Sequence, residues 1–278
     1  MAGEALRIAL IQTRTPATAQ AALDHIAPLI REAAAGGARL ILTPEASNLM
    51  EQRRDRRGEA IVDQDADPAV QALRALAAEL GVWLLIGSAI VRSGDDARSA
   101  NRSLLIDPQG QITAAYDKLH VFDVDLPNGE TYRESSGVRP GDRAVVAETP
   151  WGRLGLTVCY DLRFPHLFRA LAKAGASIIA VPAAFTVPTG EAHWETLLRA
   201  RAIETGAFVL APAQGGAHED GRRTWGRSTV VAPWGEVIAR LDNDEPGVLF
   251  ADLDLAAVDK ARRAIPALTH DRAFDPPT

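Results

Sequence analysis

The chain has 278 residues, 30 Lys and Arg against 36 Asp and Glu, and a formal net charge of -6. Such a mildly acidic chain lacks the basic surplus that neutralises phosphates, so we expect no nucleic-acid partner. No apolar stretch reaches the ~18 residues of a membrane span, and the amino terminus lacks the pattern of a secretion signal. We therefore expect a cytoplasmic protein with no membrane partner. Since no seam divides the sequence, we also expect one domain over residues 1–278.

The first ninety residues alternate short apolar runs with helical segments. Thr18 to Ala35 has helical spacing and is closed by a glycine pair, and a second helix ends near Leu80. The apolar runs have the length and composition of buried strands: LRIALIQ (6–12), ARLILTPE (38–45) and VWLLIGSAIV (82–91). This order predicts a βαβαβ arrangement.

The next segments predict antiparallel pairing and then a return of the alternation. RSLLID (102–107) and QITAAYDK (111–118) flank a turn sequence around Pro108 and Gly110, which is typical of adjacent antiparallel strands. A long loop is expected over 119–142, and loops of that length are usually functional. Helices are expected over 165–174 and 192–205. The remaining strands are expected at AVVAET, GRLGLTVCYD, SIIAVPAAF, AFVLAPAQ, RSTVVAP, EVIARLD and GVLFADLD.

So many strands with so few helices predict an α/β fold in which two mixed β-sheets pack face to face with helices outside, an αββα four-layer sandwich. A doubly wound nucleotide-binding fold is the competitor. It would carry G-x-G-x-x-G after the first strand or a G-x-x-x-x-G-K-[ST] loop, and the sequence has neither. The six histidines show no metal-binding spacing. We therefore expect no cofactor and no metal.

Three predicted strands end in residues whose side chains can take part in catalysis. Glu45 closes LILTP, Lys118 closes AAYDK, and Cys159, the only cysteine, closes GLTV. A thiol with a pKa of ~8.5 is mostly protonated at neutral pH, so it needs a base to react and a cation or amide donors to hold the oxyanion that it creates. A carboxylate and an ammonium are suitable partners for such a nucleophile.

These residues lie in motifs that resemble a known family. LTPEAS around Glu45, YDKLHVFDVD around Lys118 and VCYDLRFP around Cys159, in this order, resemble the nitrilase superfamily of carbon-nitrogen hydrolases with its Glu-Lys-Cys triad. The resemblance covers essentially the whole chain and extends to TYRES (131–135), where this branch carries a second functional carboxylate, here Glu134. CYDLRFP together with AHWE (192–195) is most similar to the branch of amidases that act on amides of 2-oxo acids.

The resemblance implies a cysteine hydrolase that converts a small carboxylate-bearing amide to an acid and ammonia through a thioester. Glu45 would take the Cys159 proton, while Lys118 and the Tyr160 main-chain N–H would hold the oxyanion. Glu134 would orient water or Lys118. The resemblance also implies a homodimer or a higher homo-oligomer.

Four further residues are candidates for substrate binding. Arg163 is expected either to clamp a substrate carboxylate or to pair with Asp161. His193, Trp194 and Tyr132 are candidates for the pocket wall, although a Trp in a helix more often packs in the core. His120 is expected to be a structural histidine, and the run from Arg53 to Arg57 a solvated loop.

Two other classes of protein stay open. A papain-like hydrolase would pair the cysteine with a histidine base, either His166 or His193. A non-catalytic scaffold of the same fold would be expected to have lost at least one member of the set Glu45, Lys118 and Cys159, and all three are present.

Overall fold

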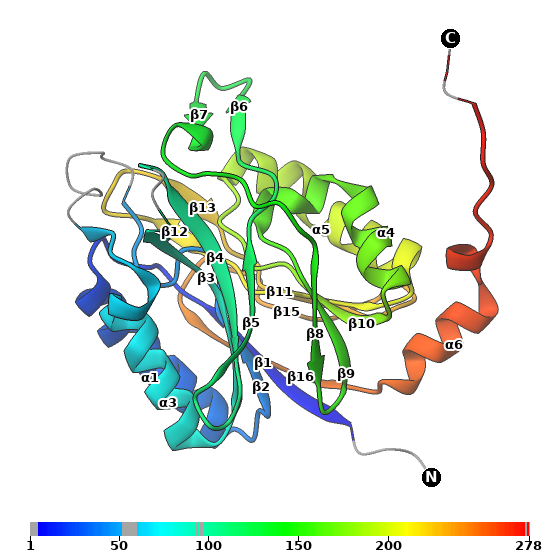
Figure 1. Cartoon of the computed structure of the whole chain (residues 1–278), viewed down its shortest axis with the longest axis horizontal. Helices are drawn as coiled ribbons and strands as arrows, with labels where there is room; N and C mark the ends of the chain where they lie inside the picture. The colour runs from blue at the N-terminus through cyan, green and yellow to red at the C-terminus, as the bar shows by residue number, and fades with distance from the viewer. Residues whose placement is uncertain (1–4, 52–59, 93, 95–96, 276, 278) are drawn as a thin grey trace.

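Two six-stranded mixed sheets form the centre of the protein (Figure 1). The computed structural model describes residues 5–51, 60–92, 94, 97–275 and 277. The expected α/β sandwich of two mixed sheets with helices outside is confirmed. The arginine run 53–57, expected as a solvated loop, lies outside the described residues.

The first sheet has the strand order β16-β1-β2-β3-β4-β5. β1, β2 and β3 are parallel to one another, and the other neighbours are antiparallel. Helices α1 (Ala19–Ala35) and α3 (Pro68–Leu80) cover its outer face. The strands are β1 (Leu6–Gln12), β2 (Leu40–Leu42), β3 (Trp83–Arg92), β4 (Ser99–Ile106), β5 (Ile112–Asp117) and β16 (Gly247–Leu253).

The second sheet repeats this pattern with the order β15-β14-β11-β10-β9-β8. β9, β10 and β11 are parallel, and the flanking pairs are antiparallel. Helices α4 (Pro165–Lys173) and α5 (Val187–Thr205) pack against it. The strands are β8 (Val145–Thr149), β9 (Gly152–Leu156), β10 (Ala176–Ala180), β11 (Phe208–Ala211), β14 (Thr229–Val231) and β15 (Val237–Arg240).

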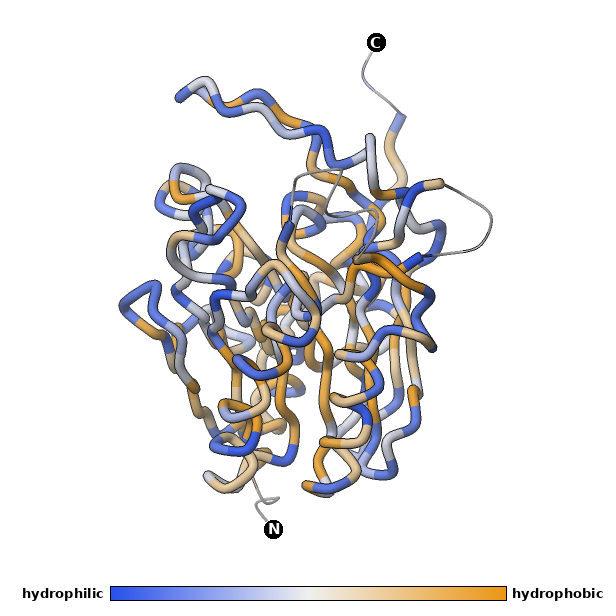
Figure 2. Tube along the Cα trace, turned by 90° about the vertical axis from the view of Figure 1, so that its left-hand side faces the viewer, coloured by the Kyte–Doolittle hydropathy of each residue, from blue (hydrophilic) through white to orange (hydrophobic). Residues whose placement is uncertain are grey.

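The two-residue period of the strands divides the core into layers. In β1, Ile8 and Leu10 join the cluster that reaches the second sheet, whereas Ala9 and Ile11 join the cluster under α1 and α3. A strand buried on both faces has no polar alternation, which explains its continuous apolar run. Figure 2 shows the same separation, with hydrophobic stretches along the interior strands and hydrophilic ones in the outlying loops.

The helix boundaries follow from capping chemistry. Thr18 caps α1 by accepting from the Ala21 N–H, and Asp67 caps α3 in the same way before Pro68. Gly81 closes α3 in the left-handed conformation. Among the described residues, no helix is long and apolar enough to cross a membrane.

Several elements differ from the sequence-based expectation. Helix α5 begins at Val187 rather than at residue 192, because Pro188 is tolerated in a first helical turn. The expected long loop contains a small hairpin, β6 (Asp123–Asp125) and β7 (Thr131–Arg133). The analysis of the sequence also missed the hairpin of β12 (Gly215–Ala217) and β13 (Arg223–Trp225) and the terminal helix α6 (Ala256–Ala264). Four 3-10 turns complete the described elements: η1 (Gln64–Ala66), η2 (Glu134–Ser136), η3 (Cys159–Arg163) and η4 (Ala267–Thr269).

Candidate active site

The structure brings Glu45, Lys118 and Cys159 together at one end of the two sheets. Glu45 lies three residues after β2, Lys118 follows β5 directly, and Cys159 lies three residues after β9. Glu45 and Cys159 follow parallel strands of different sheets. The carboxyl ends of such strands are where open α/β sheets place their ligands.

Lys118 is the centre of a buried ion cluster. Its Nζ donates to Glu45 Oε1 at 2.8 Å and to Glu134 Oε2 and Oε1 at 2.9 and 3.1 Å. The exposed fractions of the side chains are 2% for Lys118, 8% for Glu45 and 18% for Glu134. Glu134, which was expected to orient water or Lys118, contacts the Lys118 ammonium.

Two main-chain N–H groups also donate to the carboxylates. The Ala184 N–H donates to Glu45 Oε2 at 3.0 Å, and the Phe122 N–H donates to Glu134 Oε2 at 2.6 Å. These bonds compensate for the water that burial removes from the two carboxylates. Neither donor could be predicted from the sequence, because main-chain contacts depend on the fold and not on the residue type.

Cys159 occupies a strained position. Its φ is 52°, in the left-handed region that non-glycine residues rarely adopt, and its N–H donates to the Pro182 carbonyl at 2.9 Å. Asp161 stabilises the turn, because its carboxylate accepts from the Val158 N–H at 2.8 Å and from the Tyr116 hydroxyl at 2.7 Å. The Cys159 thiol lies close enough to the Glu45 carboxylate for this charge to raise its pKa.

The cluster sets the protonation states of the three predicted catalytic groups. Burial alone would raise the pKa of Glu45, but the Lys118 ammonium and hydrogen bonds lower it below its ordinary value. Burial would lower the pKa of Lys118, but the Glu134 and Glu45 carboxylates raise it well above its ordinary value. Burial and the Glu45 charge raise the pKa of the Cys159 thiol. At neutral pH the resting site therefore holds a charged base, an ammonium and a neutral thiol.

A cavity of about 480 Å³ opens onto these groups. This volume lies within the range of small-molecule sites. Glu45, Lys118, Glu134 and Cys159 all line it, and aromatic side chains Phe122, Tyr132, Tyr160 and Phe185 form part of its wall.

Arg163 lies in the cavity wall without a carboxylate partner among the described residues. Its guanidinium lies 5.3 Å from the Phe185 ring centroid and 5.9 Å from that of Tyr160, and its Nη1 is 3.3 Å from His193 Nδ1. The alternative pairing with Asp161 is not observed. Asp161 instead bonds to Tyr116, Val158 and His120, so its carboxylate is already satisfied.

Two of the expected substrate-binding residues lie elsewhere. Trp194 is buried in the core against Phe185, and its indole N–H donates to the Arg227 carbonyl. His193 lies on the exposed side of α5 and reaches the cavity only through its contact with Arg163. Neither residue lines the cavity that contains Cys159, so a role of either in substrate binding stays a prediction. Tyr132, in contrast, lines the cavity.

The geometry does not favour a histidine base. His166 is exposed and its ring contacts His120 and Phe164, so it does not reach Cys159. His193 does not line the cavity either. His120 bonds to Asp161, as expected of a structural histidine. Within the described ranges, no group of three or more His, Cys, Asp or Glu side chains is placed to hold a metal ion.

Asn101 on β4 also contacts the cluster and was not predicted from the sequence. Its Nδ2 donates to Glu45 Oε1 at 2.9 Å and to Glu134 Oε1 at 3.2 Å. An asparagine inside a strand is unfavourable, and this was the available signal.

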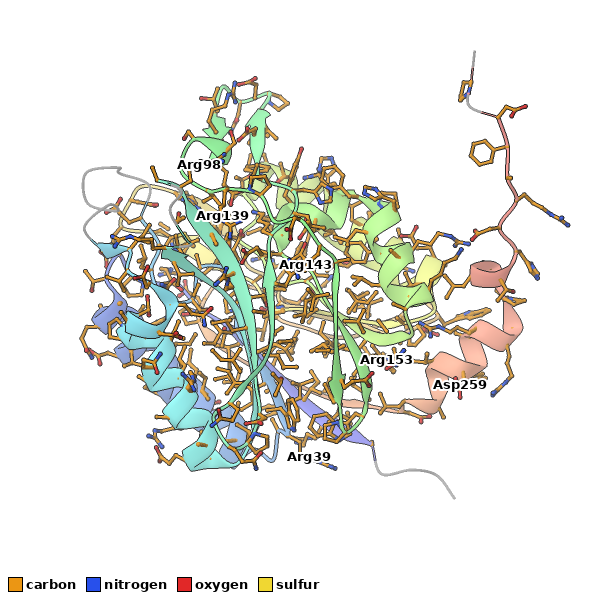
Figure 3. All side chains as sticks on the ribbon, in the orientation of Figure 1. Arg39, Arg98, Arg139, Arg143, Arg153 and Asp259 are labelled. Atoms are coloured by element: carbon orange, nitrogen blue, oxygen red, sulfur yellow. The ribbon has the colours of Figure 1, made fainter. Side chains whose placement is uncertain are left out.

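Charged side chains also fix the strand end that carries Lys118. Arg102 donates to both oxygens of Asp117, at 2.6 and 3.0 Å, and Arg139 donates to the same carboxylate at 2.9 Å. Figure 3 marks Arg139 near the upper ends of β4 and β5, whereas Arg39, which precedes β2, lies at the opposite end of the sheets. Asp117 is thereby held on the same side of the molecule as the candidate site.

Comparison with known proteins shows the family of the chain. A family model described as carbon-nitrogen hydrolase matches residues 7–263. A deaminated glutathione amidase from Yersinia enterocolitica is 46% identical over 239 residues, which are 85% of this chain and 82% of that protein.

Solved structures of carbon-nitrogen hydrolases are also similar to this chain over most of its length. Nit3 of Saccharomyces cerevisiae, a member of branch 10 of the nitrilase superfamily, is 26% identical with a TM-score of 0.87, over 98% of this chain and 97% of that one. A mutant of the amidase from Nesterenkonia sp. AN1 is 30% identical with a TM-score of 0.79, over 94% and 95% of the two chains. That structure shows covalent addition of the acetamide moiety of fluoroacetamide at the active-site cysteine. The expected resemblance is confirmed, and the chain belongs to the carbon-nitrogen hydrolase family.

Proposed function

We propose that the protein is a cytoplasmic amidase that acts on deaminated glutathione or a closely similar amide, with Glu45, Lys118 and Cys159 as its catalytic triad. The observation that carries this proposal is the convergence of these three side chains at one cavity whose wall also presents Arg163. The relatives named deaminated glutathione amidase supply the substrate class.

The first half of the proposed reaction forms a thioester. Glu45 takes the thiol proton as Cys159 Sγ bonds to the amide carbon, and the carbonyl oxygen becomes an oxyanion. Lys118 stabilises this oxyanion together with the Tyr160 N–H, which donates to no protein acceptor in the part of the chain that the structure describes. The carbon–nitrogen bond then breaks, and the leaving nitrogen receives the proton from Glu45.

The second half hydrolyses the thioester. Glu45, again a carboxylate, takes a proton from water as the water oxygen bonds to the acyl carbon. The carbon–sulfur bond breaks, the acid is released, and the proton returns to Cys159. Glu134 holds Lys118 in both halves, because both oxygens of its carboxylate accept from the ammonium.

Arg163 is the proposed partner of the substrate carboxylate. Deamination replaces the amino group of a glutamyl residue by an oxo group and leaves its carboxylate in place. A guanidinium can bind such a carboxylate through two parallel hydrogen bonds. Arg163 is suited to this role because, within the described residues, it contacts no carboxylate of the protein.

The nature of the leaving group follows from the substrate. Deaminated glutathione contains only secondary amides, so its cleavage releases a peptide amine, whereas a primary amide such as 2-oxoglutaramate releases ammonia. The cavity of about 480 Å³ is large enough for a substrate that extends beyond the acyl group. We propose deaminated glutathione first for this reason, and 2-oxoglutaramate as the alternative.

The test is a substrate panel followed by mass spectrometry. The panel contains deaminated glutathione, 2-oxoglutaramate, simple aliphatic amides, nitriles and N-carbamoyl amino acids, and each product is identified by mass. Rapid quenching of a good substrate is expected to show an acyl adduct on Cys159, the one cysteine of the chain. Cys159→Ala is expected to remove both the adduct and the turnover. Wild-type turnover in this variant, or no adduct and no product with any compound, would contradict the proposal.

We further propose that the protein is a homodimer, as its resemblance to the superfamily implies. Large apolar side chains lie exposed on α5, on the turn between β14 and β15 and after α6, which supports an apolar contact with a second copy.

A further inference from the structure

Asn101 is a buried amide whose side-chain hydrogen bonds, among the described residues, go only to the two carboxylates beside Lys118. It lies on β4, its exposed fraction is 2%, and its Nδ2 donates to Glu45 Oε1 and Glu134 Oε1 at 2.9 and 3.2 Å. Its main-chain carbonyl also accepts from the Lys118 N–H at 2.9 Å. The same residue therefore contacts the lysine through its backbone and both partners of that lysine through its side chain.

The orientation of the amide is fixed by electrostatics. If the group were rotated by 180°, Oδ1 would face two carboxylate oxygens and no donor would remain between them. In the observed orientation Oδ1 is buried and has no hydrogen-bond partner among the described residues. An unpaired buried acceptor is destabilising, so the residue is poorly explained as part of the scaffold.

Asn48 provides a structural contrast. It is also buried and lies near the same strands, but its side chain bonds to Asp67 Oδ2 and to both main-chain groups of Ile90. Both polar atoms of Asn48 are satisfied, and none of its bonds reaches a triad member. Asn48 thus has the contacts of a structural asparagine, and Asn101 does not.

We propose that Asn101 is a positioning residue that holds Glu45 and Glu134 together against Lys118 and keeps Glu45 charged as the general base. This inference rests on the proposed function for the role of Glu45. Two carboxylates that share one ammonium repel each other, which favours protonation of one of them. An amide with two N–H groups opposes this effect, because each N–H stabilises one carboxylate without adding charge. A carboxylate at this position would worsen the repulsion, and a hydroxyl could donate to only one of the two.

The charged and titratable groups around the Glu45 carboxylate are few. Lys118 approaches from the end of β5, Cys159 from η3, and Glu134 from η2 through the shared lysine. The pKa values of Lys118 and Cys159 are raised, and Glu45 is the carboxylate that takes the thiol proton in the proposed mechanism. A movement of the acid limb of activity therefore reports on Glu45.

The test compares Asn101→Ser and Asn101→Asp with Asn48→Ser in the full-length protein. The first measurement is kcat/KM against pH on the best amide of the panel, and circular dichroism verifies folding. Loss of a hydrogen bond to a charged group is expected to move the acid limb upward by about one pH unit in Asn101→Ser, and further in Asn101→Asp. Asn48→Ser is expected to lower thermal stability while its acid limb stays within about 0.2 unit of the wild type.

A second measurement does not depend on the natural substrate. Iodoacetamide is expected to alkylate Cys159, the one cysteine of the chain. Because the thiolate is the reacting form, the rate is expected to depend on Glu45 as the base that takes the thiol proton. Its acid limb should move with that of turnover. If no amide is cleaved by the wild type, the proposed function fails while the alkylation profile still tests Asn101.

Three outcomes would overturn the inference. The first is an acid limb in both Asn101 variants that matches the wild type. The second is an equal shift in Asn48→Ser. The third is failure of both Asn101 variants to fold while Asn48→Ser folds, which would assign Asn101 to the scaffold.

Discussion

The chemistry at the residue scale depends on where one negative charge resides. In the resting site Glu45 carries it beside Lys118, and in the proposed transition state it moves to the substrate oxygen while Glu45 takes the thiol proton. Lys118 can stabilise the charge on the substrate oxygen only if another group holds its ammonium in place after Glu45 has become neutral. Glu134 supplies that contact, with two oxygens at 2.9 and 3.1 Å from the ammonium.

These protonation states predict a broad pH profile. Glu45, whose pKa is lowered below about 4.5, is a base that is active above its pKa and inactive when the pH falls through it. Lys118 and Cys159 have raised pKa values, so neither changes charge as the pH rises from neutrality to about 9. We expect kcat/KM to stay within about threefold from pH 5 to pH 9 while circular dichroism shows a folded protein. A bell centred near pH 6.5 would instead indicate a histidine base.

A second prediction at this scale concerns the form of the cation. Lys118→Ala should lower kcat by about 10²- to 10³-fold with a smaller effect on KM, the usual result of removing one oxyanion donor. Lys118→Arg should not restore it, because a planar guanidinium cannot place a compact charge between two carboxylates that leave the side chain 2% exposed. Arg139→Lys, at a partly exposed site beside Asp117, serves as a control for exchanging the two cations. Full activity of Lys118→Arg would assign the oxyanion to backbone donors.

At the scale of elements, Gly87 lies in close contact with the segments that position the base Glu45 and the nucleophile Cys159. It lies at a register shift in β3. A Cβ there would lie 1.9 Å from the Thr43 carbonyl oxygen, 2.5 Å from the Pro44 carbonyl oxygen and 2.5 Å from Pro182 Cβ. Thr43 and Pro44 precede Glu45, and the Pro182 carbonyl accepts the Cys159 N–H.

We therefore predict that Gly87→Ala displaces both halves of the site. Neither backbone can move aside without moving a strand end, so we expect a loss of about 1 to 3 kcal/mol in the free energy of unfolding. The displacement should also lower kcat/KM by about 10- to 100-fold. Chemical denaturation and steady-state kinetics measure the two effects.

Gly247→Ala on β16 is the matched control. The nearest atom to its added Cβ is Leu241 Cδ1 at 4.0 Å, an ordinary contact, so the change in stability should stay within about 0.5 kcal/mol. If the two variants behave alike, the close approach at Gly87 is not what holds the strand ends.

The helices and strands also show which parts of the fold could be predicted from the sequence. Buried strands such as β1 and β3 are continuous apolar runs, and α1 and α3 have caps that can be read locally, so their positions agreed with expectation. The hairpin β6–β7 was missed because its strands are three residues long and largely exposed. Helix α6 was missed because only two of its residues, Val258 and Ala261, are buried.

The residues of the candidate site also divide into those that could be predicted from the sequence and those that could not. Glu45, Lys118 and Cys159 were predictable because each follows an apolar run and lies in a family motif. Asn101 and the Ala184 N–H were not, because they reach Glu45 across 56 and 139 residues of sequence. For Trp194 both alternatives, the core and the cavity wall, stayed open because the sequence does not state which way α5 is rotated, and the structure places the side chain in the core.

At the scale of the whole molecule, three exposed apolar side chains from distant segments lie in one shallow depression. Ile203 of α5 and Trp234 of the β14–β15 turn are each 55% exposed, and Ile265 after α6 is 59% exposed. Such grouping on a surface marks a contact region more often than scattered apolar residues do. Because α5 carries part of the patch and also begins at the cavity wall with Thr186 and Thr189, a contact at the patch would support the helix that borders the site.

We predict that this patch is the contact of the proposed homodimer. Sedimentation should give twice the chain mass of 29.7 kDa at micromolar concentration. Ile203→Glu and Trp234→Glu should each give a monomer, because a carboxylate buried in an apolar contact without a partner is strongly unfavourable. Ala75→Glu, on the exposed face of α3 over the first sheet, should leave the dimer intact. A monomeric wild type would refute the dimer itself. Dimeric Ile203→Glu and Trp234→Glu variants would move the contact to another surface, for which the edge strands β8 and β15 are the next to test, since each leaves one row of main-chain groups unpaired within its sheet.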